Sequence, residues 1–154
     1  MSQSGLSFLR ARDAAHAAAR DVRASSARHV LLVEDDPAVR SSLAEVLEAE
    51  GFDVATAPNG RAALEVLRTG PPPSAIVLDL MMPVMDGWDF RHAQLADPAL
   101  KDIPVVVVTA AGFSSETIRA QFGDVRFVPK SVPVDQLREA LDRVCARASL
   151  AAAG

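Results

Sequence analysis

Short apolar runs alternate with amphipathic segments along the chain from residue 29 onward. We interpret five segments as strands, over 29–33, 52–56, 74–79, 103–109 and 125–128, and expect all of them except 52–56 to be buried. The segments that follow them have helical apolar spacing or helix-capping residues, over about 37–50, 59–69, 86–95, 114–121 and 133–148. Apolar strands that alternate with helices are typical of a parallel sheet covered on both faces. The pattern therefore predicts an α/β fold with five parallel strands.

Polar residues lie at or just past the carboxyl ends of four predicted strands. Along the chain these are Asp35 with Asp36, then Asp79, Thr109 and Lys130. The carboxyl ends of parallel strands lie side by side, at the edge of the sheet where ligands bind. We therefore expect three carboxylates, one hydroxyl and one ammonium group to converge on one pocket. Such a set suits a divalent cation and a phosphoryl group.

The expected pocket has the groups that phosphoryl transfer to a carboxylate requires. Magnesium prefers oxygen ligands and binds through one or two carboxylates together with phosphate oxygens. A bound dication would keep Asp79 ionised, and an ionised carboxylate can attack phosphorus to form an aspartyl phosphate. Lys130 and the Thr109 hydroxyl can each meet a phosphoryl oxygen. Lys130 is one of only two lysines in the chain, beside 14 arginines.

Each residue of this set also has an ordinary structural interpretation. Asp36 precedes Pro37, which suits a first helical turn, and so could simply cap the helix. Asp79 could be a solvated strand end, Thr109 could reflect the β-propensity of threonine, and Lys130 could be a surface charge. The ordered placement of all of them at strand ends favours a shared site over separate accidents.

Composition and charge narrow the classes of function. The chain has 154 residues, 49% of them apolar and 23% charged, which fits one soluble globular domain. Its net charge of −4 is uneven, because residues 1–29 carry +3 and residues 30–154 carry −7. An acidic body argues against direct nucleic-acid binding. The single cysteine, Cys145, excludes an intrachain disulfide.

The sequence predicts a cytoplasmic protein that does not span a membrane. No apolar stretch approaches the roughly 18 residues that a membrane helix needs. The N-terminus has no convincing apolar core of a signal peptide.

The predicted domain organisation is an N-terminal extension over 1–28, a folded domain over 29–148 and a short tail over 149–154. The extension is rich in Ala, Ser and Arg, and residues 6–23 favour a helix. It is either a solvated, disordered segment or a helix that docks or dimerises. We expect the protein to be a monomer or a weak homodimer.

Four segments of the chain match a known pattern. They are VLLVEDDPAVR (30–40), IVLDLMMPVMDGWDF (76–90), PVVVVTA (104–110) and FVPK (127–130). With these segments, residues 29–147 resemble the receiver domain of two-component response regulators, in its stand-alone single-domain type. The resemblance implies a flavodoxin-like, doubly wound (βα)5 fold with strand order 2-1-3-4-5 and helices on both faces.

The resemblance also implies roles for the acidic residues. Asp79 would be the phosphoacceptor. Asp36 and Asp79 would bind Mg²⁺ directly, and Asp35 would act partly through water. The backbone carbonyl of Met81 would be a further ligand of the metal.

The same resemblance implies a switch. Thr109 and Lys130 would contact the phosphoryl group once the acceptor carries it. Thr109 would then shift toward that group, and Phe127, at the position of the family's switch aromatic, would rotate into the vacated space. The surface formed by the last two helices and the last strand would change as a result. Phosphorylation would thus bias an existing two-state equilibrium.

Two features of the chain differ from the usual pattern of the family. The family usually has proline after its lysine, whereas here Ser131 follows Lys130. The helix over 114–121 has a thin apolar face, so we expect it to be either short or mobile. Elsewhere the pattern is kept, and Pro83 and Gly87 would shape the loop after the acceptor aspartate.

We predict a phosphoacceptor in a two-component or phosphorelay pathway. Its donor would be a histidine kinase or a histidine phosphotransfer protein, and its target a downstream protein rather than nucleic acid or a membrane. Its chemistry would be self-phosphorylation and self-dephosphorylation, without enzymatic turnover. One alternative is a phosphorylation-independent interaction module. Another is a haloacid-dehalogenase-type hydrolase, but that family needs a general acid two residues after its nucleophile, where this chain has Met81.

Overall fold

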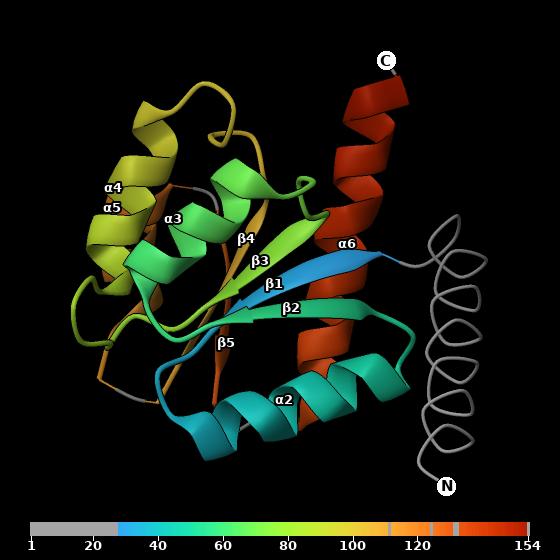
Figure 1. The fold of residues 1–154 in the computed structure, drawn as a ribbon, viewed down its shortest axis with the longest axis horizontal. Helices are drawn as coiled ribbons and strands as arrows, with labels where there is room; N and C mark the ends of the chain where they lie inside the picture. Colours follow the sequence, from blue (N-terminus) through green and yellow to red (C-terminus); the bar gives the residue numbers. More distant parts are fainter. Residues whose placement is uncertain (1–27, 111, 124, 131–132, 154) are drawn as a thin grey trace, which may run out of the picture.

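The computed structural model of the protein describes residues 28–110, 112–123, 125–130 and 133–153. Its strands form one parallel sheet in the order β2-β1-β3-β4-β5 (Figure 1). This arrangement confirms the predicted α/β class and the strand order. The helix predicted over 6–23 lies outside the described residues.

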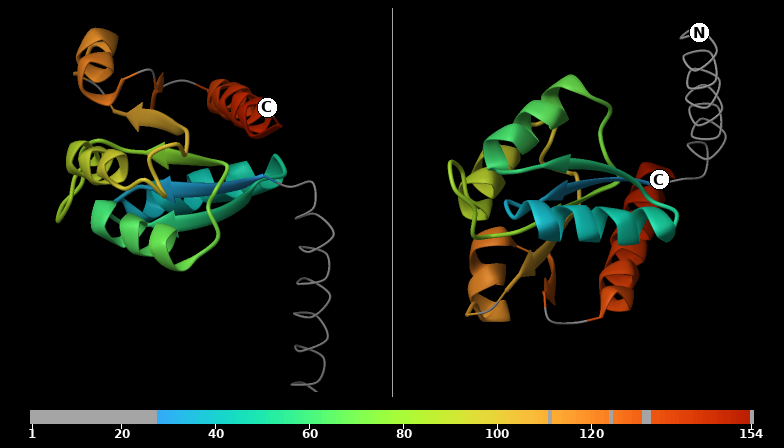
Figure 2. Two further views of the ribbon diagram at one scale, coloured as in Figure 1. Left: turned by 90° about the horizontal axis from the view of Figure 1, so that it is seen from above. Right: turned by 60° about the horizontal axis from the view of Figure 1, so that its bottom comes forward.

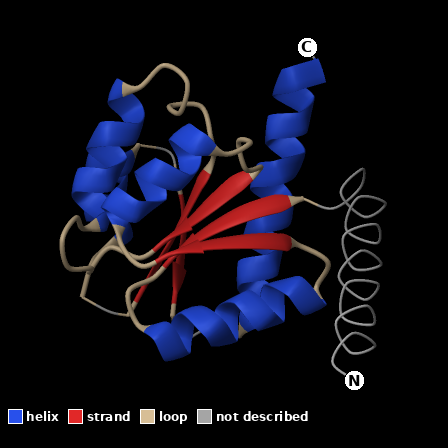
Figure 3. Ribbon diagram, viewed as in Figure 1, coloured by secondary structure: helices blue, strands red, loops and turns tan. Residues whose placement is uncertain are grey.

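The observed elements follow the predicted ones closely (Figure 3). The strands are β1 (His29–Val33), β2 (Asp53–Ala57), β3 (Ala75–Leu78), β4 (Val105–Thr109) and β5 (Arg126–Pro129). The helices are α2 (Pro37–Ala49), α3 (Gly60–Thr69), α4 (Gly87–Ala96), α5 (Ser115–Phe122) and α6 (Val134–Ala153). The largest difference is at the end of α6, which was expected near residue 148. Residues 149–153 are mostly alanine, the strongest helix former, and this favours the longer helix.

Side chains from the two faces of the sheet form two apolar cores. On one face, Ile76 and Val107 belong to a core with residues of α3, α4 and α5. On the other face, Val77 and Val106 belong to a core with residues of α2 and α6. The strands β3 and β4 are buried at every residue because helices cover both of their faces. The prediction of helices on both faces is therefore confirmed.

Polar side chains define where the helices begin. Four helices start after an N-cap residue whose side chain accepts hydrogen bonds from backbone N–H groups of the first turn. These N-caps are Asp36, Asn59, Asp86 and Ser114. Such caps satisfy N–H groups that have no partner within the helix.

None of the helices in the described ranges is long and apolar enough to cross a membrane.

Candidate functional site

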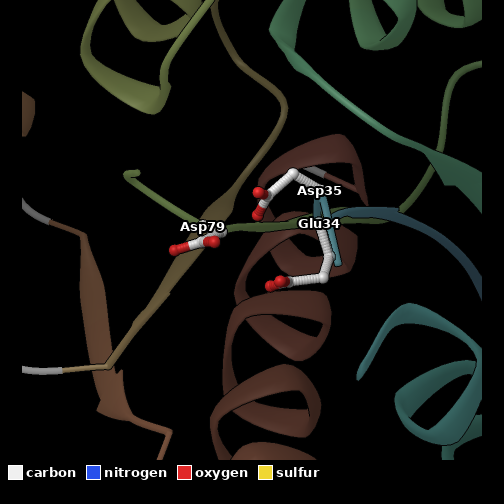
Figure 4. Close-up of side chains that lie close together, drawn as sticks. All are labelled: Glu34, Asp35 and Asp79. Carbon is white, nitrogen blue, oxygen red and sulfur yellow. The ribbon is translucent and has the colours of Figure 1, made fainter. Parts of the chain in front are cut away.

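Three carboxylates meet at the carboxyl ends of β1 and β3. Glu34 and Asp35 follow β1, and Asp79 follows β3. One carboxylate oxygen of each residue lies within 4.8 Å of the oxygens of the other two. Figure 4 shows the three side chains gathered around a common space. Carboxylates this close repel one another, so the cluster favours a positively charged partner.

The backbone of the sheet holds two of these residues in place. The backbone N–H of Asp79 donates to the Val33 carbonyl at 3.1 Å, and that of Glu34 donates to the Ala57 carbonyl at 3.1 Å. These bonds continue the strand ladders one residue past the ends of β3 and β1. Glu34 and Asp79 are consequently buried, at 2% and 5% exposure, while Asp35 is partly buried.

Lys130 supplies a positive charge to the cluster. Its Nζ lies 2.7 Å from Glu34 Oε2 and 3.2 Å from Asp79 Oδ2. The backbone N–H of Lys130 donates to the Thr109 carbonyl at 3.0 Å, which fixes the residue at the end of β5. The structure therefore places Lys130 beside Asp79, as expected from its position after the fifth strand. Ser131, where the chain differs from the usual family pattern, lies outside the described residues.

Burial and mutual contact govern the protonation of this pair. Burial raises the pKa of Glu34; the hydrogen bond from Lys130 lowers it in part, and the nearby charge of Asp79 raises it further. Burial alone would lower the pKa of Lys130, but its hydrogen bonds to Glu34 and Asp79 and their charges outweigh this effect, so the pKa is raised. Lys130 therefore stays protonated at neutral pH and offsets part of the acidic charge.

Asp36 lies outside the carboxylate cluster, which corrects the predicted acidic pair. Its side chain accepts hydrogen bonds from the backbone N–H groups of Ala38 at 2.9 Å and Val39 at 3.3 Å, as the N-cap of α2. Asp36 is exposed, whereas Glu34 is buried beside Asp79. The structure thus favours Glu34 with Asp35 over Asp35 with Asp36 as the acidic pair. It gives Asp36 the capping role that was its structural alternative.

The other predicted residues lie at different distances from the carboxylate cluster. Thr109 is the last residue of β4 and is 2% exposed. Met81 follows Asp79 by two residues, and its side chain is 63% exposed. Phe127 is partly buried in β5, where it pairs with Val107 of β4. Thr109 and Phe127 therefore lie on the strands that the sequence predicted for them, and Met81 lies in the loop after Asp79.

The loop between β3 and α4 packs tightly against its surroundings. A Cβ atom on Gly87 would lie 2.5 Å from the Asp79 carbonyl oxygen, so only glycine fits there. The Gly87 N–H also donates to the Leu80 carbonyl at 2.9 Å. The Gly60 N–H, at the start of α3, donates to the Met85 carbonyl at 2.9 Å and holds the loop from the other side. The predicted role of Gly87 in shaping the loop thus has a steric cause.

The carboxylate cluster fits a small divalent cation. All of its ligand atoms are carboxylate oxygens, the ligand type that magnesium prefers. With every group ionised, the three carboxylates and Lys130 carry a net charge of −2, which one dication balances. Asp35 is only partly buried, so one of the three carboxylate residues is open to solvent.

Comparison with known proteins identifies the family. The family model of the response regulator receiver domain matches residues 30–142. The chain belongs to this family. Receiver domains are signalling modules, and the acidic cluster with Lys130 lies where β1, β3 and β5 of this one end.

Relatives of the receiver domain occur both as longer proteins and as proteins of similar length. The chain is 37% identical over 109 residues to the response regulator MprA of Mycolicibacterium vanbaalenii, covering 70% of this chain and 46% of MprA. It is 32% identical over 130 residues to the two-component response regulator ORR5 of Oryza sativa subsp. japonica, covering 83% of this chain and 93% of ORR5. The chain thus spans about half the length of MprA and most of ORR5.

Solved structures of receiver domains have the same fold. The response regulator TrrA of Thermotoga maritima, solved in complex with Mg²⁺-BeF, superimposes with a TM-score of 0.67 at 28% identity. The match covers 76% of this chain and 98% of TrrA. This similarity agrees with the strand order and the two helical layers of the described residues.

Proposed function

We propose that this receiver domain accepts a phosphoryl group on Asp79 from a phosphohistidine donor, and that Mg²⁺ is required. The donor would be a histidine kinase or a histidine phosphotransfer protein. The observation that carries the proposal is the meeting of the three carboxylates with Lys130 around Asp79. An aspartate used only for folding would gain nothing from two further carboxylates so close to it.

The residues around Asp79 divide the tasks of the transfer. An Asp79 oxygen attacks phosphorus and the phosphorus–nitrogen bond of the donor breaks, with its electron pair staying on the imidazole nitrogen. Glu34, Asp35 and Asp79 would hold Mg²⁺, together with the backbone carbonyl of Met81. When bound, the ion would neutralise charge on the phosphoryl oxygens. Lys130 and Thr109 would stabilise the remaining oxygens.

Glu34 has a role that supports Lys130. Lys130 bridges Glu34 and Asp79 before transfer, so its ammonium group is already positioned for a phosphoryl group on Asp79. When Asp79 becomes an acyl phosphate, one of its oxygens loses its negative charge. Lys130 can then contact the phosphoryl oxygens while its ion pair with Glu34 is kept. Positioned cations of this kind are a main contribution of proteins to phosphoryl transfer.

The output surface would be the face formed by α5, β5 and α6. Thr109 ends the strand beside β5, and Phe127 lies within β5, so a shift of Thr109 can reach this edge of the sheet. The short α5 buries only Ile118 and Phe122, and a helix with so few anchors can move at low cost. These features support a change of the α5-β5-α6 face upon phosphorylation, with a downstream protein as its reader.

Mass spectrometry of the intact protein tests whether Asp79 is the phosphoacceptor. Wild type and Asp79→Asn are incubated with acetyl phosphate, with and without Mg²⁺. We expect one added phosphoryl group in wild type with Mg²⁺ and none in the other three samples. Folded wild type that gains no mass from acetyl phosphate or from a phosphorylated histidine phosphotransfer protein would contradict the proposal. That result would favour the phosphorylation-independent interaction module.

Three matched substitutions test which acidic residues hold the metal. We expect Glu34→Gln and Asp35→Asn to weaken Mg²⁺ binding by about tenfold or more in calorimetric titration. Asp36→Asn is the control, because asparagine caps a helix as well as aspartate does. Its affinity for Mg²⁺ should stay close to that of wild type. Equal losses in Asp36→Asn and Asp35→Asn would restore Asp36 as a ligand.

A further inference from the structure

A cleft of about 670 Å³ lies beside the edge strand β5, apart from the carboxylate cluster. Its walls come from α4, the connection from α4 to β4, α5, β5 and α6. Figure 2 shows β5 between α5 and α6 at this edge of the sheet. Ile103 and Val105 line the cleft where β4 begins, whereas Thr109 ends β4 and Asp79 follows the end of β3. The cleft is therefore a separate feature of the domain.

Positive charge is concentrated in this cleft. Five basic residues line it, namely Arg91, Lys101, Arg119, Arg126 and Arg147. They are five of the 11 basic residues in 30–154, whereas Asp102 is the only acidic residue of the described ranges that lines the cleft. Within the described ranges, none of the five has a carboxylate oxygen within 4.0 Å of its nitrogen atoms. The cleft thus carries positive charge on an otherwise acidic body.

Hydrogen bonds hold the side chain of Arg91, which lines the cleft, in place. Its Nη1 donates to the side-chain oxygen of Gln94 at 2.8 Å, and its Nη2 donates to the Phe122 carbonyl at 2.9 Å. Its Nε is buried and has no hydrogen-bond partner among the described residues. Burial lowers the pKa of Arg91, but a guanidinium group remains protonated at neutral pH. A permanent charge is therefore held at a fixed place in the cleft.

Apolar side chains lie between the basic ones. Ile103, Ile118, Val125, Phe127 and Val144 also line the cleft. A ligand that complements it must therefore combine negative charges with apolar groups. We propose that this cleft is the docking site for a downstream protein that presents an acidic segment with apolar side chains among its carboxylates.

The net negative charge of the domain favours a short protein segment over nucleic acid as the ligand of the cleft. The phosphates of a nucleic acid would continue past the cleft onto a surface whose net charge is negative, and would be repelled there. A peptide can confine its carboxylates to the cleft, and its apolar side chains can use the apolar walls. Interactions with the rest of the body are screened beyond about 8 Å at physiological ionic strength. The local positive charge therefore decides which partner is attracted.

This inference rests on the proposed function in one respect, because the cleft lies on the face proposed for output. Phe127, at the position of the switch aromatic, is one of its lining residues. A rearrangement of Phe127 would change the shape of the cleft itself. The cleft thus indicates which charges and apolar groups a protein that binds the output face must present, and the phosphoacceptor site does not indicate this.

Charge reversal at two exposed arginines of the cleft tests the proposal. Arg119→Glu with Arg147→Glu reverses two charges of the cleft, on α5 and α6. Arg61→Glu with Arg143→Glu is the matched control, because both residues are exposed on helices, neither lines the cleft, and the change in net charge is the same. The probe is a fluorescein-labelled peptide of repeated Glu-Glu-Leu, and its affinity is measured by fluorescence anisotropy on the full chain. Circular dichroism checks that both double variants are folded.

We expect wild type and the control to bind the peptide with similar affinity, and the cleft variant to lose about tenfold or more. Absence of binding to wild type, or equal losses in the two double variants, would overturn the proposal. Tighter binding of oligothymidine than of the peptide, lost only in the cleft variant, would overturn it in favour of nucleic acid. A wild-type dimer in sedimentation that only the cleft variant loses would overturn it in favour of a second copy of the chain. Phosphorylation by acetyl phosphate, measured in the same cleft variant, keeps a failure here distinct from a failure at Asp79.

Discussion

The substitution Gly87→Ala tests whether only glycine fits between α4 and the backbone of the β3–α4 loop. Gly87 begins α4, and its Cα faces the backbone that carries the proposed phosphoacceptor. An added Cβ would lie 2.5 Å from the carbonyl oxygen of Asp79 and 2.8 Å from the Cα of Leu80. Both neighbours are backbone atoms, so no side-chain rotation can relieve the overlap. Either the start of α4 or the Asp79–Leu80 backbone must move.

The expected cost follows from these distances. Favourable contacts between carbon atoms lie at about 3.5–4.0 Å, so the two backbones must part by up to about 1 Å. Insertion of a methyl group into a packed position typically costs about 1–3 kcal/mol. Alanine also restricts the unfolded chain more than glycine does, which offsets about 0.4–1 kcal/mol. We therefore expect Gly87→Ala to lower the free energy of unfolding by about 1–2 kcal/mol.

Urea denaturation, followed by circular dichroism, measures this loss. Gly70→Ala is the control, because Gly70 is exposed, its φ of −117° suits alanine, and the nearest neighbour of its Cβ is a single carbonyl oxygen at 3.2 Å. We expect Gly70→Ala to change the free energy of unfolding by less than about 1 kcal/mol. If Gly87→Ala proved as stable as wild type, the close approach of α4 to the Asp79 backbone would not exist in solution.

Three further predictions concern single positions. Val84 is 76% exposed with a φ of 69°, a conformation that a β-branched residue rarely adopts, so Val84→Asn should raise the free energy of unfolding by about 1 kcal/mol in urea denaturation. Gln94 is fully buried, and its side-chain amide donates to two backbone carbonyls at 3.0 Å each. Gln94→Met should therefore lower the free energy of unfolding by about 2–4 kcal/mol, whereas Gln121→Met on the surface should leave it almost unchanged. Burial raises the pKa of Cys145, so at mildly alkaline pH its thiol should react with Ellman's reagent far more slowly in the folded protein than in urea. For the same reason the free energy of unfolding should fall as the pH rises above the ordinary pKa of a thiol. Fast reaction of the folded protein would contradict the burial of Cys145.

Local signals in the sequence were sufficient to predict the α/β class with its strands and helices, whereas the strand order was implied by the resemblance to the family. β1, β3 and β4 are short, mainly apolar runs, and Asn59 and Ser114 mark helix starts that the structure confirms as N-caps. The placement of polar residues at strand ends was equally local, because it depends only on where each run stops. For that reason the sequence alone assigns Asp79, Thr109 and Lys130 to one edge of the sheet.

Interactions between distant segments could not be predicted in the same way. The ion pair of Lys130 with Glu34 joins the end of β5 to the end of β1, and it depends on side-chain reach across two intervening strands. The charged cleft combines residues of α4, α5, β5 and α6 that show no spacing pattern along the chain. Gly87 could be recognised as a loop residue, but the reason for glycine lies in how closely α4 approaches the Asp79 backbone.

The choice between Glu34 and Asp36 could in fact have been made from the sequence. Three acidic residues follow β1, and the next residue is Pro37. Proline is favoured at the first position of a helix, so the residue before it is the N-cap. An N-cap aspartate turns its carboxylate toward the N–H groups of its own helix, which takes it away from the end of the sheet. Once Asp36 is committed to that role, only Glu34 and Asp35 remain to face Asp79, as the structure has them.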